Sequence, residues 1–135
     1  MKLLFTIILL FLLSNTAHAK WFFGTWKVDE AKTYEIIGEE HKTSFVGLTI
    51  AILKDQVIDI RSDKIQVSVA DKTQDILYEI KTLEESSAIL ELADSPKDFE
   101  LGRDIHGTYM IVRKTVKVDS DVTNSEAHHV YLKPL

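Results

Sequence analysis

The feature of this chain that most constrains its fold is an alternation of apolar and polar residues in its second half. Such alternation puts successive side chains on opposite faces, which is typical of half-buried β-strands. The clearest stretch is "VIDIRSDKIQVSV", residues 57–69. With its central Ser-Asp pair as a two-residue turn, Ile60 faces Ile65 and Ile58 faces Val67. The stretch therefore predicts a β-hairpin with one apolar face.

Further alternating segments follow at similar spacing, separated by polar turns. They are residues 75–83, 87–93, 97–104, 108–118 and 128–134, and residues 23–28 add a first strand. We expect the polar residues 119–127 to form a loop before the last strand, so that residues 115–135 hold a polar loop and a closing strand. Consecutive hairpins favour an up-and-down meander, and closure removes exposed edges. The predicted fold is mainly β, an antiparallel up-and-down β-barrel of seven to eight strands.

Residues 29–54 interrupt this pattern. Asp29 is a good helix N-cap, and Gly38 is a good helix end. Between them, Ala31, Tyr34 and Ile37 fall on one helical stripe. We therefore expect a short helix directly after the first strand.

The apolar run at residues 44–53 is ambiguous. Alternate residues from Val46 to Ile52 are apolar, as in a strand, while Phe45, Leu48 and Ile52 fit helical spacing. Periodicity cannot decide such a short run. Ser44 as a cap favours a second helix, and the strand interpretation stays open.

The N-terminus has the pattern of a secretory signal peptide. A short basic start is followed by the apolar residues 3–13 and by the small-x-small site Ala17-His18-Ala19. A membrane anchor is the alternative, but the apolar core is well short of the roughly 20 residues that span a bilayer. We expect residues 1–19 to be removed and residues 20–135 to be exported as one domain, periplasmic or secreted, with no stable membrane anchor.

The composition of the chain excludes disulfide bonds and limits the classes of partner that it can bind. The chain has no cysteine, so burial alone must stabilise an exported domain of this size. Without residues 1–19, which carry one lysine, 15 basic and 21 acidic side chains remain. This acidic balance gives no footprint for nucleic acid and argues against a basic membrane-binding patch.

The sequence offers no recognisable catalytic or metal-binding constellation. Two of the histidines outside residues 1–19, His41 and His106, fall in expected loops, and the adjacent His128 and His129 would point to opposite faces of a strand. The chain carries no nucleophile turn, phosphate loop or zinc-protease motif. We expect no catalytic residues, no metal and no cofactor, and we do not expect an enzyme.

The stretch "FFGTWKVD" resembles the opening of the calycin group, the lipocalins and fatty-acid-binding proteins, whose first strand carries a G-x-W motif. Here the motif is Gly24, Thr25 and Trp26. The chain is more similar still to small bacterial lipocalin-like domains, in which a helix start like "DEAKT", a hairpin like residues 58–67 and a strand ending in arginine, here Arg113, recur. The resemblance covers residues 22–114.

That resemblance implies a structural signature. In lipocalins the motif tryptophan plugs one barrel end and a late-strand arginine lies over its ring, which here implies Trp26 as the plug and Arg113 as its cover. The fatty-acid-binding proteins imply the alternative that Arg113 or Arg103 reaches a ligand carboxylate. Trp21 lies outside the motif and has no predicted place.

Two functions follow as hypotheses. The first is a lipocalin-like protein that binds a small apolar or amphipathic molecule in a barrel cavity beneath the helices. The candidates to line it are Tyr34, Phe45, Tyr78, Phe99 and Tyr109, although ordinary core packing is the favoured interpretation for each. The second is a filled barrel without ligand that acts on a protein partner of the cell envelope, as an inhibitor or accessory factor.

Overall fold

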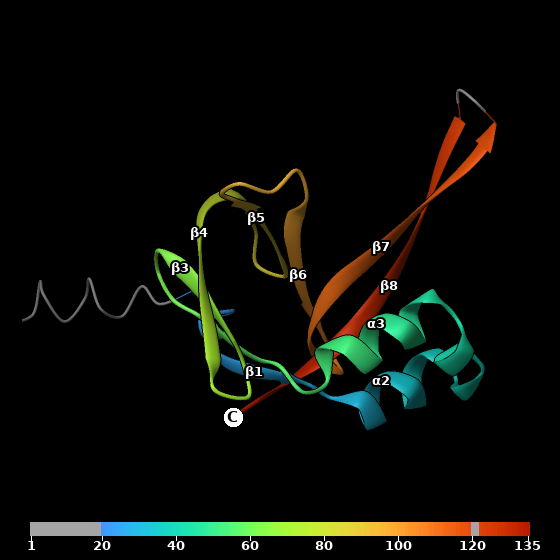
Figure 1. Cartoon of the computed structure of the whole chain (residues 1–135), viewed down its shortest axis with the longest axis horizontal. Coiled ribbons are helices and arrows are strands. Elements are labelled where there is room, and N and C mark those ends of the chain that lie inside the picture. Colours follow the sequence, from blue (N-terminus) through green and yellow to red (C-terminus); the bar gives the residue numbers. More distant parts are fainter. Residues whose placement is uncertain (1–19, 120–121) are drawn as a thin grey trace, which may run out of the picture.

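Eight antiparallel strands follow one another around a closed barrel (Figure 1). The structure is a computed structural model that describes residues 20–119 and 122–135, so the predicted signal peptide lies outside the described residues. The strands are β1 (Gly24–Val28), β2 (Val57–Ile60), β3 (Lys64–Val69), β4 (Lys72–Leu83), β5 (Ser87–Leu92), β6 (Asp98–Asp104), β7 (Gly107–Asp119) and β8 (Val122–Pro134). The predicted mainly β, up-and-down barrel is confirmed, with eight strands.

The hairpin of β2 and β3 has the predicted register. Ile58 pairs with Val67 and Ile60 with Ile65. The Arg61 N–H donates to the Lys64 carbonyl at 2.9 Å and closes the turn. The apolar–polar alternation predicts this register because a shift of one residue would turn the whole apolar face to water.

The same apolar face continues around the barrel and forms the core. Every strand contributes at least one buried side chain, which is aliphatic in each strand except β4, where it is Tyr78. The inward residues that are buried are Val28, Ile58, Ile60, Ile65, Tyr78, Ala88, Leu90, Leu101, Met110, Val112, Val130 and Leu132. Each buried large aliphatic side chain contributes about 1.5–3 kcal/mol, which is how a chain without disulfides can hold this fold.

The first expected helix, α2 (Glu30–Ile37), forms directly after β1. The Asp29 carboxylate accepts from the Lys32 N–H at 3.0 Å, and Gly38 ends the helix with φ of +106°. The predicted stripe was wrong at Ala31, which is exposed, because Thr33 and Tyr34 are the residues that α2 buries.

Thr33 explains that difference. Strand β1 ends at Val28, and beyond it α2 lies beside β8 in place of a strand. The Thr33 hydroxyl accepts from the Tyr131 N–H at 2.9 Å and donates to the Asp29 carbonyl at 2.8 Å. A buried N–H at the edge of β8 is thereby satisfied by a helix side chain.

The ambiguous run folds as a helix, α3 (Phe45–Leu53), which follows a short 3₁₀ helix, η1 (Glu39–Thr43). The proposed role of Ser44 as a side-chain cap was wrong, because its hydroxyl donates instead to the His41 carbonyl at 2.7 Å. Gly47 is buried where α3 crosses η1, and a Cβ there would collide with the Lys42 carbonyl. This close approach fixes α3 against η1.

The predicted polar loop at residues 119–127 was wrong in its described part. Strands β7 and β8 pair from Tyr109 and Tyr131 out to Asp119 and Val122, with one shift of register between Lys117 and Asp119. The outer part of this ribbon extends beyond the barrel (Figure 1). Away from the core a two-stranded ribbon needs no apolar face, so residues 122–127 carry no alternation to detect.

Candidate functional site

The barrel wall opens between β6 and β7. These strands pair only from Leu101 with Met110 to Asp104 with Gly107. Beyond that point they diverge beneath α3 and leave a pocket with a volume of about 570 Å³. We call it the β6–β7 opening, and it is lined by Phe45, Thr49, Lys97, Asp98, Phe99, Glu100, Met110, Ile111, Val112 and Arg113.

The inner wall of the β6–β7 opening is apolar and its rim is polar. Phe99, Met110 and Val112 share the inward face of their strands, and Phe45 reaches the same pocket from α3. The opening has a volume of 570 Å³ and is open to solvent on one side. A largely apolar wall with a few polar groups is the usual lining of a small-molecule site of this size.

An ion pair bridges the rim. The Arg113 guanidinium binds Glu100 with both nitrogens of its fork, Nη2 to Oε1 at 2.9 Å and Nε to Oε2. This hydrogen bond raises the pKa of Arg113 above its already high value. The opening therefore has a permanent cation at its edge, held in place by a carboxylate that a competing anion could replace.

Of the five residues predicted to line a cavity, the structure brings two together. Phe45 from α3 and Phe99 from β6 both line the β6–β7 opening. Tyr34 instead lines a separate groove between α2, α3 and β1. The prediction of a common wall rested on apolar character alone, which does not distinguish one barrel end from another.

The other two predicted wall residues lie elsewhere. Tyr78 is inward, but its hydroxyl donates to the Arg61 carbonyl. Tyr109 points outward, where its ring stacks on His129 with ring centroids 3.9 Å apart. The register explains this, since Tyr109 is the neighbour of the inward-facing Met110 on β7.

The signature tryptophan is half-buried on the inward face of β1. Trp26 packs against the core between its ladder partners Ile58 and Pro134. Its indole N–H donates to the Phe22 carbonyl at 2.9 Å. Gly24 has a φ of +136°, a backbone conformation that residues with a side chain rarely adopt. This conformation explains why the motif has a glycine at this position.

The predicted cover of that ring by Arg113 was wrong. Arg113 follows the inward Val112, so it lies on the outer face of β7, where it binds Glu100. The stacked arginine is Arg103, whose guanidinium carbon lies 5.0 Å from the centre of the Trp21 ring.

Trp21 thereby has a place that the sequence did not reveal. Its indole N–H donates to the Glu84 carbonyl at 3.2 Å, and Arg103 Nε donates to the Glu85 carbonyl at 2.7 Å. Its ring meets the fully buried Phe22 edge to face at 5.3 Å. Trp21 and Arg103 together hold the chain before β1 against the β4–β5 turn.

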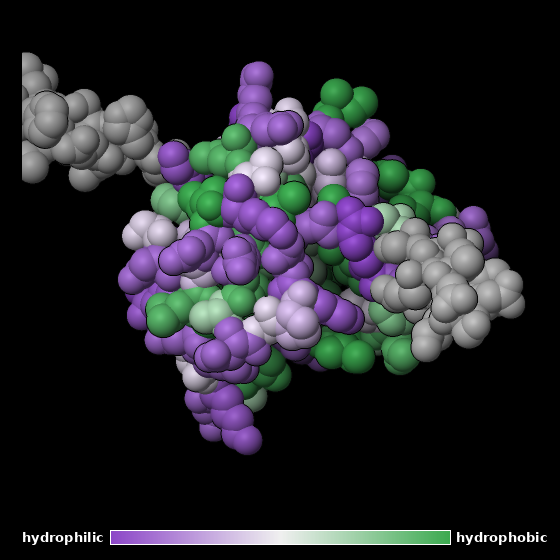
Figure 2. All heavy atoms as spheres, turned by 90° about the horizontal axis from the view of Figure 1, so that it is seen from above, coloured by the Kyte–Doolittle hydropathy of each residue, from purple (hydrophilic) through white to green (hydrophobic). Residues whose placement is uncertain are grey.

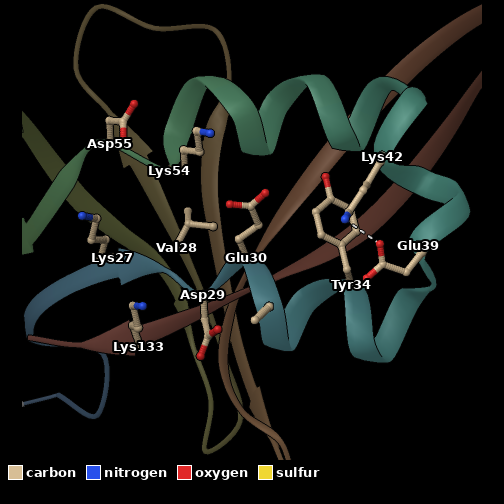
Figure 3. Close-up of a pocket in the computed structure, with 11 residues that line it drawn as sticks. Lys27, Val28, Asp29, Glu30, Tyr34, Glu39, Lys42, Lys54, Asp55 and Lys133 are labelled. Carbon is tan, nitrogen blue, oxygen red and sulfur yellow. Dashed lines mark ion pairs between the residues drawn. The ribbon is translucent and has the colours of Figure 1, made fainter.

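The second groove is charged. It has a volume of 590 Å³ and lies between the two helices and the ends of β1 and β8 (Figure 3). Four lysines and four carboxylates line it, among them the ion pair of Lys42 and Glu39 at 2.6 Å. Its mixed charges suit water and ions better than an apolar ligand, so the β6–β7 opening is the better candidate site.

A polar cluster on the outer face, which the sequence did not indicate, ties β6, β8 and the β6–β7 turn to α2. The Tyr131 hydroxyl donates to Asp104 at 2.6 Å, and Lys32 Nζ donates to the His106 carbonyl at 2.8 Å. Burial pushes the pKa of Asp104 up, but hydrogen bonds from Tyr131 and from the His106 N–H outweigh it and hold that pKa below its usual value. Burial and the same carboxylate raise the pKa of Tyr131.

The surface as a whole is mixed. Figure 2 shows hydrophilic side chains over much of one face, with hydrophobic patches between them. Within residues 20–119 and 122–135, no three histidine or acidic side chains gather in a way that could hold a metal ion. Across the same described ranges, no helix has the length and apolar character to cross a membrane.

Comparison of the chain with protein-family models, with curated proteins and with solved structures finds no match.

Proposed function

We propose that this chain is an exported, lipocalin-like protein of the calycin type that binds a small amphipathic molecule at the β6–β7 opening. One observation carries the proposal. The ladder between β6 and β7 stops at Leu101 and Met110, and the inward apolar residues just beyond it line a pocket instead of a sealed wall. Export, to the periplasm or the medium, rests on the signal-peptide pattern of residues 1–19.

The lining indicates the chemistry of the ligand. Its apolar part would lie against Phe45, Phe99 and Met110, where it would displace water from apolar surface. Its polar part would lie at the rim, near Arg113 and Lys97. An anionic head group fits this rim best, because it could take the place of Glu100 at the Arg113 guanidinium.

The calycin assignment is supported by the first strand and the barrel. Trp26 of the G-x-W motif packs against the core of an eight-stranded antiparallel barrel, and two short helices follow the first strand. The pairing of an arginine with a tryptophan is also present, although Arg103 and Trp21 form it. The proposal includes no reaction and no cofactor.

Titration with a fluorescent amphipathic anion, anilinonaphthalene sulfonate, tests the proposal. We expect saturable binding that a long-chain carboxylate displaces, and a loss of affinity of about tenfold or more in Phe99→Asp, because the variant puts a charge in the apolar wall. The matched control is Leu77→Asp, which changes an exposed leucine of β4. Equal binding by both variants, or no displaceable binding by the original chain, would refute it.

A second candidate is the filled barrel that acts on an envelope protein. It is favoured by the packing of the core, where Ile50, Leu90 and Leu101 are fully buried, and by the ribbon of β7 and β8 that extends beyond the barrel. A pull-down from envelope extract at low salt tests it. Because this candidate requires a specific partner, a pull-down that recovers no partner would refute it.

A further inference from the structure

Three lysines meet at one end of the charged groove. Lys27 lies near the end of β1, and the ladders of that strand place it opposite Lys133 of β8 on one side and Val57 of β2 on the other. Lys54 follows α3 directly and precedes β2 by a short turn. All three lysines line the groove, and Figure 3 shows them at the opposite end from Tyr34. We call this part of the groove the lysine end.

The pairing of Lys27 with Lys133 is unfavourable by itself. Partners in an antiparallel ladder share one face of the sheet, and like charges directly opposite each other destabilise it. Both side chains lie on the outer face of the barrel, because their neighbours Val28 and Leu132 are buried in the core. An anion bound between the two ammonium groups would replace this repulsion with attraction.

The carboxylates of the groove do not neutralise the lysine end. None of its three lysines forms an ion pair with any residue that the structure describes, whereas Lys42 at the other end is paired with Glu39 at 2.6 Å. The carboxylate of Asp29 caps α2. Glu30 and Asp55 are the other acidic residues of the lining, so the lysine end keeps an excess of positive charge.

We propose that the lysine end binds a phosphate group, either as free phosphate or as the terminal group of a small phosphate ester. A phosphate dianion offers several oxygens to ammonium groups that approach from different sides, and lysine binds it as a point charge. Those ammonium groups come from three segments, which are β1, β8 and the turn after α3. The chain has a net charge of −5, which disfavours extended polyanions such as nucleic acid or an anionic membrane, so the ligand is compact.

The lysine end is separate from the β6–β7 opening. The two sets of lining residues have no member in common, and the opening has its own cations, Lys97 and Arg113. An amphipathic molecule at the opening therefore does not need the lysine end. Phosphate binding goes beyond the proposed function and does not depend on it.

Isothermal titration calorimetry at low ionic strength and about pH 8, where phosphate esters are dianions, tests the site. Inorganic phosphate and glycerol phosphate are titrated separately, and the tighter binder identifies the source of the phosphate group. We expect saturable binding, and Lys133→Gln should raise the dissociation constant by about tenfold or more. The matched control is Lys72→Gln, which removes the same charge from an exposed position on β4 and should leave the dissociation constant unchanged.

Stability gives a second readout, which a purely structural lysine would not produce. In buffer without multivalent anions, Lys133→Gln should raise the urea unfolding midpoint, because it removes the repulsion with Lys27. Added phosphate should raise the midpoint of the original chain more than that of the variant. The proposal would be overturned by the absence of saturable binding, by an equal loss of affinity in Lys133→Gln and Lys72→Gln, or by a lower midpoint of Lys133→Gln without phosphate.

Discussion

Two tryptophans near the start of β1 make different contacts. Trp26 is half-buried against the core and its indole N–H donates to the Phe22 carbonyl, while Trp21 lies under Arg103 beside the β4–β5 turn. Each indole N–H therefore has a partner, as a packed tryptophan requires. The segment before β1 is held by these two rings, so substitutions there should affect the whole barrel.

The first prediction concerns the two arginines. Arg103→Ala should lower the free energy of unfolding by about 1 kcal/mol and shift tryptophan emission, because the guanidinium covers the Trp21 ring. Arg113→Ala should change the stability by less and leave the emission unchanged, because it loses only an exposed ion pair with Glu100. Urea unfolding followed by fluorescence measures both, and a larger emission shift in the Arg113 variant would contradict this assignment.

The second prediction concerns Gly102, which pairs with Tyr109 across β6 and β7. A Cβ on Gly102 would collide with the Tyr109 ring, and that ring is held between His129 and Tyr131. Gly102→Ala should therefore destabilise the fold by about 1–3 kcal/mol.

A double-mutant cycle supplies the control for that prediction. In a Tyr109→Ala background the ring is gone, so Gly102→Ala should have little further effect on the unfolding midpoint. If the two substitutions are additive, the ring and the glycine do not interact as described.

For single residues, the sequence predicted some contacts and missed others. The G-x-W motif predicted an inward Trp26, and the ring is half-buried against the core, because position along β1 fixes which face a residue occupies. It could not tell which arginine stacks on a tryptophan, since that depends on the register between strands distant in sequence. The place of Trp21 was hidden for the same reason.

Among the elements, the helices differ in how they begin. The carboxylate of Asp29 caps α2, whereas the hydroxyl of Ser44 turns back to η1. The sequence rule for caps identified both residues but not this difference. It could not do so because a preceding 3₁₀ turn offers the serine another acceptor, the His41 carbonyl.

The third prediction follows from that difference. Asp29→Ala should lower the free energy of unfolding by about 1 kcal/mol, because the Lys32 N–H loses its acceptor. Ser44→Ala is the matched variant and should have a smaller effect, since no N–H of α3 depends on its side chain. Urea unfolding midpoints compare the two, and an equal or larger loss for Ser44→Ala would be inconsistent with the capping described.

The fourth prediction concerns the bond that joins β6 to β8 through Asp104 and Tyr131. The folded pKa of Asp104 is lowered, so its contribution to stability is present above the unfolded value of about 3.9 and is lost as pH falls through the folded value. Tyr131→Phe should therefore cost about 1 kcal/mol at pH 7 and less once the carboxyl is protonated.

Unfolding midpoints between pH 7 and about pH 2.5 measure this dependence. Tyr34→Phe is the control, because it removes the hydroxyl of a buried tyrosine of α2 that is not bonded to Asp104. A constant difference between the Tyr131 variant and the original chain at all pH values would show that Asp104 does not titrate against this hydroxyl.

The order and pairing of the strands in the whole molecule follow from the alternation of apolar and polar residues in its sequence. Because one face of each strand had to be buried, the order and antiparallel pairing of the strands could be predicted, including the register of β2 and β3. The place where the barrel opens could not, because Phe99 and Val112 have the same apolar character as fully sealed core residues. Phe99 and Val112 differ from sealed core residues only because they lie beyond Leu101 and Met110, where β6 and β7 stop pairing.

The central claim is that the β6–β7 opening holds a small amphipathic molecule in an exported protein. Native mass spectrometry of the protein purified from its own host's envelope tests this most directly. We expect a chain that begins at Lys20 and carries a small molecule, which the Phe99→Asp variant lacks and the Leu77→Asp variant retains. A protein that repeatedly carries no small molecule, or that carries one equally in both variants, would contradict it.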